Sequence, residues 1–170
     1  MASTFQSMTS KSLGNLISYS KHPSGIEGHT SNGTFKVCIY TDSIARITAT
    51  LKDKFEDFSY SVVSTPDKAP FEIIDQDDFI KISTKAFVLS ISKKPARFSF
   101  QDLQGRVINE DDSFGTSWIG EQVTTYKKLQ HHVRFIGLGE KTGPLDRKGA
   151  AYQNWNSDAY AYNTGTDPPC

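Results

Sequence analysis

The chain has 170 residues, which is enough for one domain with a sizeable core, because folding at this length buries roughly 70% of the unfolded surface. Lysine plus arginine and aspartate plus glutamate both number 19, so the formal net charge is zero. This balance removes the basic footprint of a nucleic-acid-binding protein and gives no reason to expect binding to an anionic membrane.

Cysteine usage and the N-terminus give only slight information on the compartment. Cys38 and Cys170 cannot make a disulfide framework and match no metal-binding spacing, so we expect two free thiols. No apolar run reaches the roughly 20 residues of a membrane helix. Residues 1–10 are rich in Ser and Thr and lack the basic start and apolar centre of a signal peptide, which slightly favours the cytoplasm.

Short strands separated by Gly, Pro, Asn and Asp turns account for most of the chain. Residues 1–12 are expected to be a flexible lead-in, and the charged residues 52–57 to carry a short helical turn. The predicted strands span 13–20, 26–30, 34–41, 44–51, 60–64, 71–74, 79–84, 86–92, 97–101, 106–109, 116–119, 121–128 and 132–136.

Alternation of apolar and polar residues predicts which strand faces are buried. In 34–41, one face carries Phe35, Val37 and Ile39, while Lys36, Cys38 and Tyr40 lie on the other; in 86–92, Phe87, Leu89 and Ile91 share a face. We therefore predict an all-β fold, an antiparallel β-sandwich over 13–136, followed by an irregular loop segment over 137–170.

Catalytic and metal-binding patterns are missing from the sequence. There is no Gly-x-Ser-x-Gly elbow, and Gly137-Leu138-Gly139 does not open a helix, so it is no dinucleotide site. Adjacent His131 and His132 would point to opposite faces of a strand. We expect neither a metal nor a cofactor.

An acidic run, Glu110-Asp111-Asp112, precedes Ser113-Phe114-Gly115. We interpret it as a turn with solvated charges rather than a calcium loop or a catalytic carboxylate pair.

The most distinctive stretch lies near the C-terminal end. Residues 134–149 place four glycines and a proline between charged residues, and residues 152–160 place aromatic side chains among amides and Asp158. Aromatic faces beside amides and a carboxylate suit a sugar, whose ring can stack while its hydroxyls form hydrogen bonds.

These motifs resemble a known family. Phe-Ile-Gly-Leu-Gly-Glu-Lys over 135–141, Leu-Asp-Arg-Lys-Gly over 145–149, Trp-Asn-Ser-Asp-Ala over 155–159 and the following Asp167-Pro168 resemble the end of the N-terminal β-sandwich domain of family 31 glycoside hydrolases, the α-glucosidase and α-xylosidase group. Pro169-Cys170 departs from the apolar-aromatic pair expected there.

The resemblance implies a galactose-mutarotase-like sandwich that packs on a following (β/α)8 barrel of the same polypeptide. That barrel carries both catalytic aspartates and hydrolyses terminal α-glycosidic bonds of oligosaccharides with retention. A loop of the sandwich domain reaches the substrate pocket. Here Asp158 would contact sugar hydroxyls, with Asn156 and Tyr160 flanking it. The barrel is missing, so we expect a fragment that is inactive alone.

The remaining residues of the stretch have structural interpretations. Gly137 and Gly139 would let the chain leave the sandwich, and Tyr152 and Trp155 would pack on the barrel or on sugar. Ion pairs across the domain interface are expected from Arg134, Glu140, Lys141, Asp146 and Arg147. The sandwich should also expose an apolar docking face. A free-standing carbohydrate-binding module and a protein-interaction domain remain alternatives.

Overall fold

The computed structural model describes residues 9–52, 54–55, 58–66, 69–139 and 143–154. The chain divides into two units, residues 1–128 and residues 129–170, which are described separately. The described residues form eleven strands, all of them in the first unit. Within these same ranges there is no helix of the length and apolarity needed to cross a membrane.

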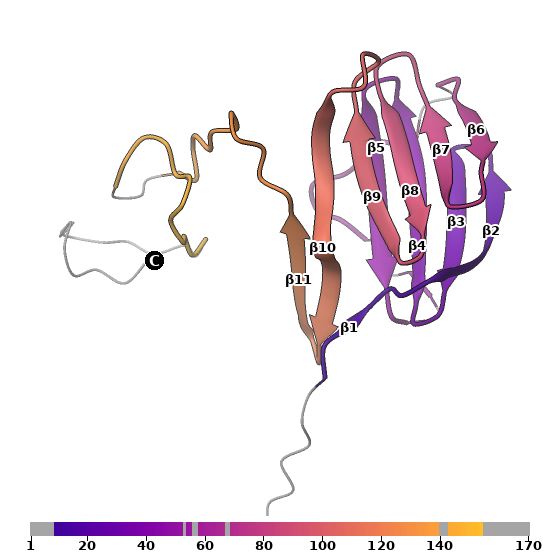
Figure 1. Ribbon diagram of the computed structural model, residues 1–170, viewed down its shortest axis with the longest axis horizontal. Helices are drawn as coiled ribbons and strands as arrows, with labels where there is room; N and C mark the ends of the chain where they lie inside the picture. Colours follow the sequence, from indigo (N-terminus) through magenta and orange to yellow (C-terminus); the bar gives the residue numbers. More distant parts are fainter. Residues whose placement is uncertain (1–8, 53, 56–57, 67–68, 140–142, 155–170) are drawn as a thin grey trace, which may run out of the picture. The chain divides into compact units, whose positions relative to one another are not determined.

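Two antiparallel sheets make up the first unit. The larger has seven strands in the order β1 (Lys11–Ser12), β10 (Val107–Ile119), β9 (Ala96–Gln101), β8 (Val88–Lys93), β7 (Phe79–Ser83) and β6 (Glu72–Asp75), with β11 (Gln122–Lys127) also paired to β10. The smaller has four, in the order β2 (Leu16–His22), β3 (Gly25–Thr30), β4 (Thr34–Thr41) and β5 (Ile44–Thr50). The sheets stack face to face (Figure 1), which confirms the predicted antiparallel sandwich.

The core lies between the two sheets and follows the predicted alternation. Phe35, Val37 and Ile39 of β4 are completely buried, while the intervening side chains are half-buried on the outer face. From the larger sheet, Leu89 and Ile91 are also completely buried. The rings of Phe35 and Phe98, one from each sheet, meet edge to face with centroids 5.2 Å apart.

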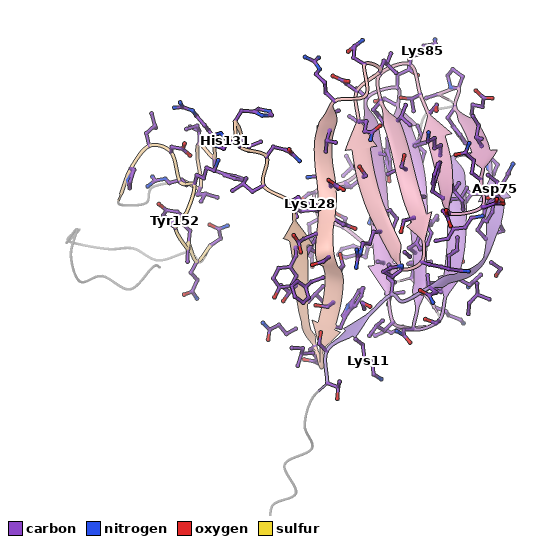
Figure 2. The ribbon with its side chains drawn as sticks, in the orientation of Figure 1. Lys11, Asp75, Lys85, Lys128, His131 and Tyr152 are labelled. Atoms are coloured by element: carbon purple, nitrogen blue, oxygen red, sulfur yellow. The ribbon has the colours of Figure 1, made fainter. Side chains whose placement is uncertain are left out.

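A polar contact joins the two sheets at their edges. Asp75 lies at the end of β6, an outer strand of the larger sheet, and β2 is an outer strand of the smaller one (Figure 2). The Tyr19 hydroxyl of β2 donates to Asp75 Oδ2 at 3.0 Å, and Lys93 Nζ lies 2.6 Å from Asp75 Oδ1. Hydrogen bonds from Lys93 and Tyr19 lower the pKa of Asp75 below its ordinary value. Burial and the hydrogen bond to Asp75 raise the pKa of Tyr19.

Strand β10 merges two segments that the sequence predicts as separate strands. Its first part pairs with β9, its second part pairs with β11 and β1, and the register with β11 shifts between Asp111 and Thr116. A bulge of this kind lets one long strand bend and change partners. The prediction of two strands, 106–109 and 116–119, with a turn between them was therefore wrong.

Three further local predictions were wrong. Residues 60–64 and 132–136 are irregular, not strands, and the described residues of 52–57 form no helical turn. Their apolar residues are exposed: Val63 is 89% and Ile136 61% accessible. Apolar alternation favours a strand only where a neighbouring strand is available to pair with it, and none of the described strands pairs with these positions.

Candidate functional site

The three predicted sugar-contacting residues, Asp158, Asn156 and Tyr160, lie outside the described residues, as do Glu140, Lys141, Trp155 and Cys170. The described part of the distinctive stretch is residues 134–139 and 143–154, within the second unit. Its geometry shows how the base of the loop is held.

Asp146 closes this loop at its base. Its Oδ1 accepts hydrogen bonds from the backbone amides of Phe135 and Lys148, both at 3.1 Å. The amide of Arg147 donates to the carbonyl oxygen of Phe135 at 2.7 Å. These bonds bring the two ends of the segment 135–147 together, as in a compact surface loop. The sequence predicted that Asp146 forms an ion pair across a domain interface. In the structure Asp146 instead accepts hydrogen bonds from backbone amides of its own unit.

The same hydrogen bonds control the charge of Asp146. The amide of Phe135, followed by that of Lys148, lowers the pKa of the carboxyl group, and the nearby positive charges of Arg134 and Lys148 act in the same direction. The pKa shift means that Asp146 stays ionised to lower pH than an ordinary aspartate, because the backbone donors stabilise the ionised form.

The two hydrogen bonds to Asp146 are called the clamp below. The backbone that follows Phe135 and Ile136 has an unusual conformation. Gly137, Leu138 and Gly139 have φ values of 117°, 70° and 73°. Glycine adopts such values readily, whereas leucine rarely does. The two glycines thus sit in backbone that suits them, but the chain does not leave the sandwich there, which corrects the sequence prediction: the last described strand ends at Lys127.

Arg147 and Tyr152 pack together beside Gly143. The Arg147 guanidinium carbon lies 5.2 Å from the centroid of the Tyr152 ring. A Cβ atom on Gly143 would lie 3.4 Å from Arg147 Nη1 and 3.5 Å from the Tyr152 hydroxyl, which is ordinary contact, so the φ of 108° rather than space favours glycine here. A further bond ties the unit together: Lys148 Nζ donates to the carbonyl oxygen of His131 at 2.9 Å. Tyr152 therefore packs within its own unit.

The acidic run 110–112 is not a solvated turn, which corrects the sequence interpretation. All three residues lie inside β10, and the Asp111 side chain is only 3% exposed. Asp111 Oδ1 lies 2.5 Å from Lys127 Nζ, while its Oδ2 accepts from the Phe98 amide at 2.9 Å. Glu110 pairs with Lys128 at 2.8 Å. Lys127 at the end of β11 and the following Lys128 therefore pair with two of the three carboxylates, and local sequence does not reveal such a partner.

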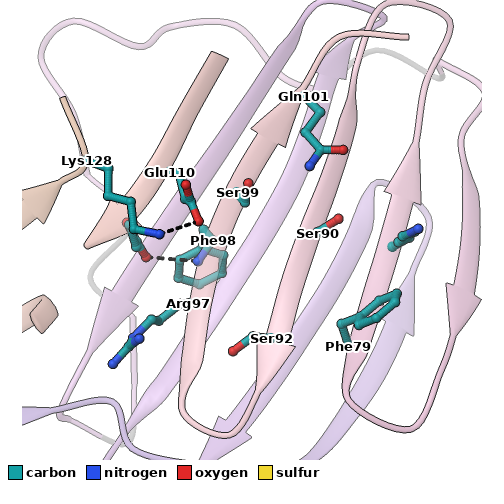
Figure 3. A pocket seen from close by; sticks show the side chains of 11 residues that line it. Phe79, Ser90, Ser92, Arg97, Phe98, Ser99, Gln101, Glu110 and Lys128 are labelled. Carbon is teal, nitrogen blue, oxygen red and sulfur yellow. Dashed lines mark hydrogen bonds and ion pairs between the residues drawn. The ribbon is translucent and has the colours of Figure 1, made fainter. Parts of the chain in front are cut away.

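A hollow on the first unit was not anticipated from the sequence. It has a volume of about 450 Å³ and lies on the outer face of β7, β8, β9 and β10. Figure 3 shows Ser90, Ser92 and Ser99 between Phe79 on one side and Arg97, Glu110 and Lys128 on the other. The available signal was serine at two alternate positions of one strand, 90 and 92, and at position 99 of the next strand.

The histidines do not assemble into a metal centre in the described part of the chain, where no group of three or more His, Cys, Asp or Glu side chains could hold an ion. His131 and His132 lie in a turn rather than in the predicted strand. Cys38 is a half-buried free thiol on β4.

Two stacked antiparallel sheets followed by a clamped, glycine-rich loop segment define a β-sandwich domain with a loop extension. The family model described as the glycosyl hydrolase 31 N-terminal galactose mutarotase-like domain matches residues 34–169. The chain belongs to this family, which confirms the resemblance inferred from the motifs.

Relatives of this chain are much longer proteins. Alpha-glucosidase 2 of Bacillus thermoamyloliquefaciens is 27% identical over 159 residues, which cover 92% of this chain and 20% of the relative. A GH31 dextranase of Flavobacterium johnsoniae, solved in complex with glucose, superposes with a TM-score of 0.84 at 25% identity, over 93% of this chain and 20% of the dextranase. The chain therefore spans 20% of the length of these two relatives.

A more distant structure shares the fold alone. The cycloalternan-forming enzyme of Listeria monocytogenes, solved with a pentasaccharide substrate, gives a TM-score of 0.65 at 11% identity, covering 80% of this chain and 14% of the enzyme. The sandwich is thus retained where little of the sequence is.

Proposed function

We propose that this chain is the non-catalytic N-terminal domain of a retaining α-glucosidase-type glycoside hydrolase. In this role the sandwich packs against a catalytic (β/α)8 barrel of the same polypeptide, and the 137–170 loop completes the pocket for a terminal α-linked sugar. Asp158 accepts hydrogen bonds from sugar hydroxyls, and Asn156 and Tyr160 flank it. The observation that carries the proposal is the family match over 34–169, because it includes both the strands of the sandwich from β4 onward and the motif-bearing loop.

The hairpin of β10 and β11 supports packing against another domain. Phe114 and Tyr126 are 69% and 46% exposed, and their ring centroids lie 5.6 Å apart. Strand β11 pairs only with β10 among the described strands, so its other edge is open. Exposed paired aromatics beside an open strand edge are typical of a surface that another domain covers.

Hydrolysis of an aryl α-glucoside tests this proposal. The assay compares the 170-residue chain, the full reading frame that contains it, and full-length Asp158→Ala. Activity only in the full frame, with kcat/KM lowered roughly 100-fold or more by the substitution, is expected, because a lost charged contact to substrate costs about 3 kcal/mol. Asp77→Ala, an exposed turn position in the first unit, is the matched control.

Two results would contradict the proposal. Unchanged kinetics in Asp158→Ala would remove the assigned substrate contact. Hydrolysis by the 170-residue chain itself would contradict a non-catalytic role. Tight sugar binding by the isolated chain through its loop would instead favour the alternative function, a free-standing carbohydrate-binding module.

A further inference from the structure

The hollow on the outer face of the larger sheet follows from the strand register. Pairing across β7, β8, β9 and β10 places Lys81, Ser90, Ser99 and Glu110 in one transverse row. The next row contains Phe79, Ser92 and Arg97. Large side chains therefore lie at both ends of each row, and serines occupy the middle.

The serines make the hollow, and the core beneath makes its floor rigid. A serine side chain rises little above a sheet, so Ser90, Ser92 and Ser99 leave an open trough between taller neighbours. On the opposite face of the same two strands, Leu89 and Ile91 are completely buried and Phe98 is 5% exposed. Close packing there fixes the positions of the hydroxyl groups.

The lining offers neutral side chains that can both donate and accept hydrogen bonds. The side chains of Ser90, Ser99 and Gln101 make no hydrogen bond within the described part of the chain. Two hydroxyls and one amide can each donate and accept. Like these groups, a sugar hydroxyl is both a donor and an acceptor, so a polyhydroxylated ring can satisfy all three.

The cationic side chains of the hollow already have partners within the protein: Lys81 lies over the Phe79 ring, and the other two are bonded as follows. Lys128 is paired with Glu110 at 2.8 Å, and the Arg97 guanidinium donates to the carbonyl oxygen of Ser113. An anionic ligand would have to approach the carboxylates of Glu110 and Asp111, which also line the hollow. This arrangement favours an uncharged ligand over a phosphate or carboxylate.

An aromatic side chain completes the arrangement. The Phe79 ring forms one wall, and the Lys81 ammonium group lies 5.0 Å from its centroid. A half-buried aromatic ring beside hydroxyl and amide groups is a combination that can pack against the apolar face of a pyranose.

We propose that this hollow is a saccharide-binding site of the first unit, which takes a short, uncharged gluco-oligosaccharide. Ser90, Ser99 and Gln101 bind its hydroxyls and Phe79 packs against one ring. The inference goes beyond the proposed function, because it assigns sugar contact to the sheet and requires neither the 137–170 loop nor a barrel.

Amide chemical-shift mapping of the 170-residue chain tests the site. Maltotriose and isomaltotriose are the neutral probes, and glucose 6-phosphate is the anionic one. We expect saturable shifts at the amides of Ser90, Ser99, Gln101 and Glu110 with a neutral trisaccharide and a Kd on the order of 1 mM.

Substitutions assign the binding to the hollow. Ser90→Ile and Ser99→Ile fill the trough with a residue that suits a strand and remove one hydroxyl each, so each should weaken binding at least about tenfold. Thr48→Ile is the matched control: Thr48 pairs with Lys36 on the outer face of the smaller sheet and should leave Kd unchanged. Gln101→Ala and Phe79→Ser make smaller changes. If an isoleucine variant unfolds, which its NMR spectrum would show by lost dispersion, these two variants test the site in its place.

Three outcomes would overturn the site. These are no saturable shift at the four amides with either trisaccharide, shifts there with glucose 6-phosphate alone, and unchanged Kd in the folded variants. Shifts confined to the 137–170 loop would also overturn it while supporting sugar contact by that loop, so the two proposals fail independently.

Discussion

Asp146 holds the backbone amide of Phe135 at 3.1 Å from its Oδ1, although eleven residues separate the two in sequence. With the second bond to Lys148, a single carboxylate fixes both ends of the loop that follows the sandwich. The aspartate of the Leu-Asp-Arg-Lys-Gly motif therefore has a structural task of its own.

The first prediction concerns this clamp. Asp146→Ala removes the acceptor shared by two amides, so we expect hydrogen exchange at Phe135 and Lys148 to accelerate on the order of tenfold. Exchange in the core strand β4 should not change, because it belongs to the other unit. Asp77→Ala is the control, and equal exchange rates in the two variants would contradict the clamp.

The second prediction concerns acid stability at the sheet edges. The pKa of Asp75 lies below its ordinary value of 3.8 because Lys93 and Tyr19 donate to it. The unfolded state therefore binds this proton more readily than the folded state does. The resulting stabilisation is complete above about pH 4 and is lost as pH falls through the folded-state pKa.

Carbon-detected NMR titration of the Asp75 carboxyl group measures this shift. We expect a midpoint below 3.8 in the native protein and closer to that value in Tyr19→Phe, which lacks the hydroxyl donor. Asp75→Asn should reduce the loss of thermal stability on acidification below about pH 4. A native midpoint above 3.8 would rule out the bridge as an acid-sensitive contact.

The third prediction concerns the packing of β3 against β4. A Cβ atom on Gly28 would lie 2.3 Å from the Phe35 ring, which is completely buried. Gly28→Ala should therefore lower the free energy of unfolding by about 1–3 kcal/mol through overpacking. In the double variant with Phe35→Leu, the smaller side chain makes room, so the two losses measured by urea unfolding should be less than additive. Full additivity would show that the two sites do not interact.

The fourth prediction concerns the buried carboxylate of β10. Asp111→Ala leaves the Phe98 amide without its acceptor and Lys127 without its partner, and should cost about 3–5 kcal/mol. Asp111→Asn should cost less, because the amide oxygen still accepts from Phe98. Equal losses in chemical unfolding of the two variants would contradict the assigned role of the backbone bond.

Sequence reasoning succeeded where a structure depends on local alternation. The buried faces carrying Phe35, Val37 and Ile39 and Leu89 and Ile91 follow directly from period-two patterns, as does the antiparallel sandwich. The family followed from an ordered motif near the C-terminal end, and the match over 34–169 confirms it.

Sequence reasoning failed where a distant partner decides the outcome. Glu110 and Asp111 belong to a strand because Lys128 and Lys127 lie opposite them, and no local signal marks that pairing. Residues 60–64 have the pattern of a strand but no neighbouring strand to bond with. The hollow was also not predicted. A serine in a strand indicates only an outward-facing position, and the register between β8 and β9 must be known before the serines can be seen to lie side by side.

The pairing of β1 with β10 also constrains the order of assembly. In this pair Lys11 lies opposite Trp118, far away in the sequence. The strands β2, β3, β4 and β5, in contrast, pair only with strands adjacent in sequence. During synthesis the smaller sheet can form from neighbouring hairpins as they leave the ribosome, since local contacts close quickly. The larger sheet cannot be completed until β10 has emerged, so β1, which is translated before the other strands of this sheet, is among the last to reach its native place.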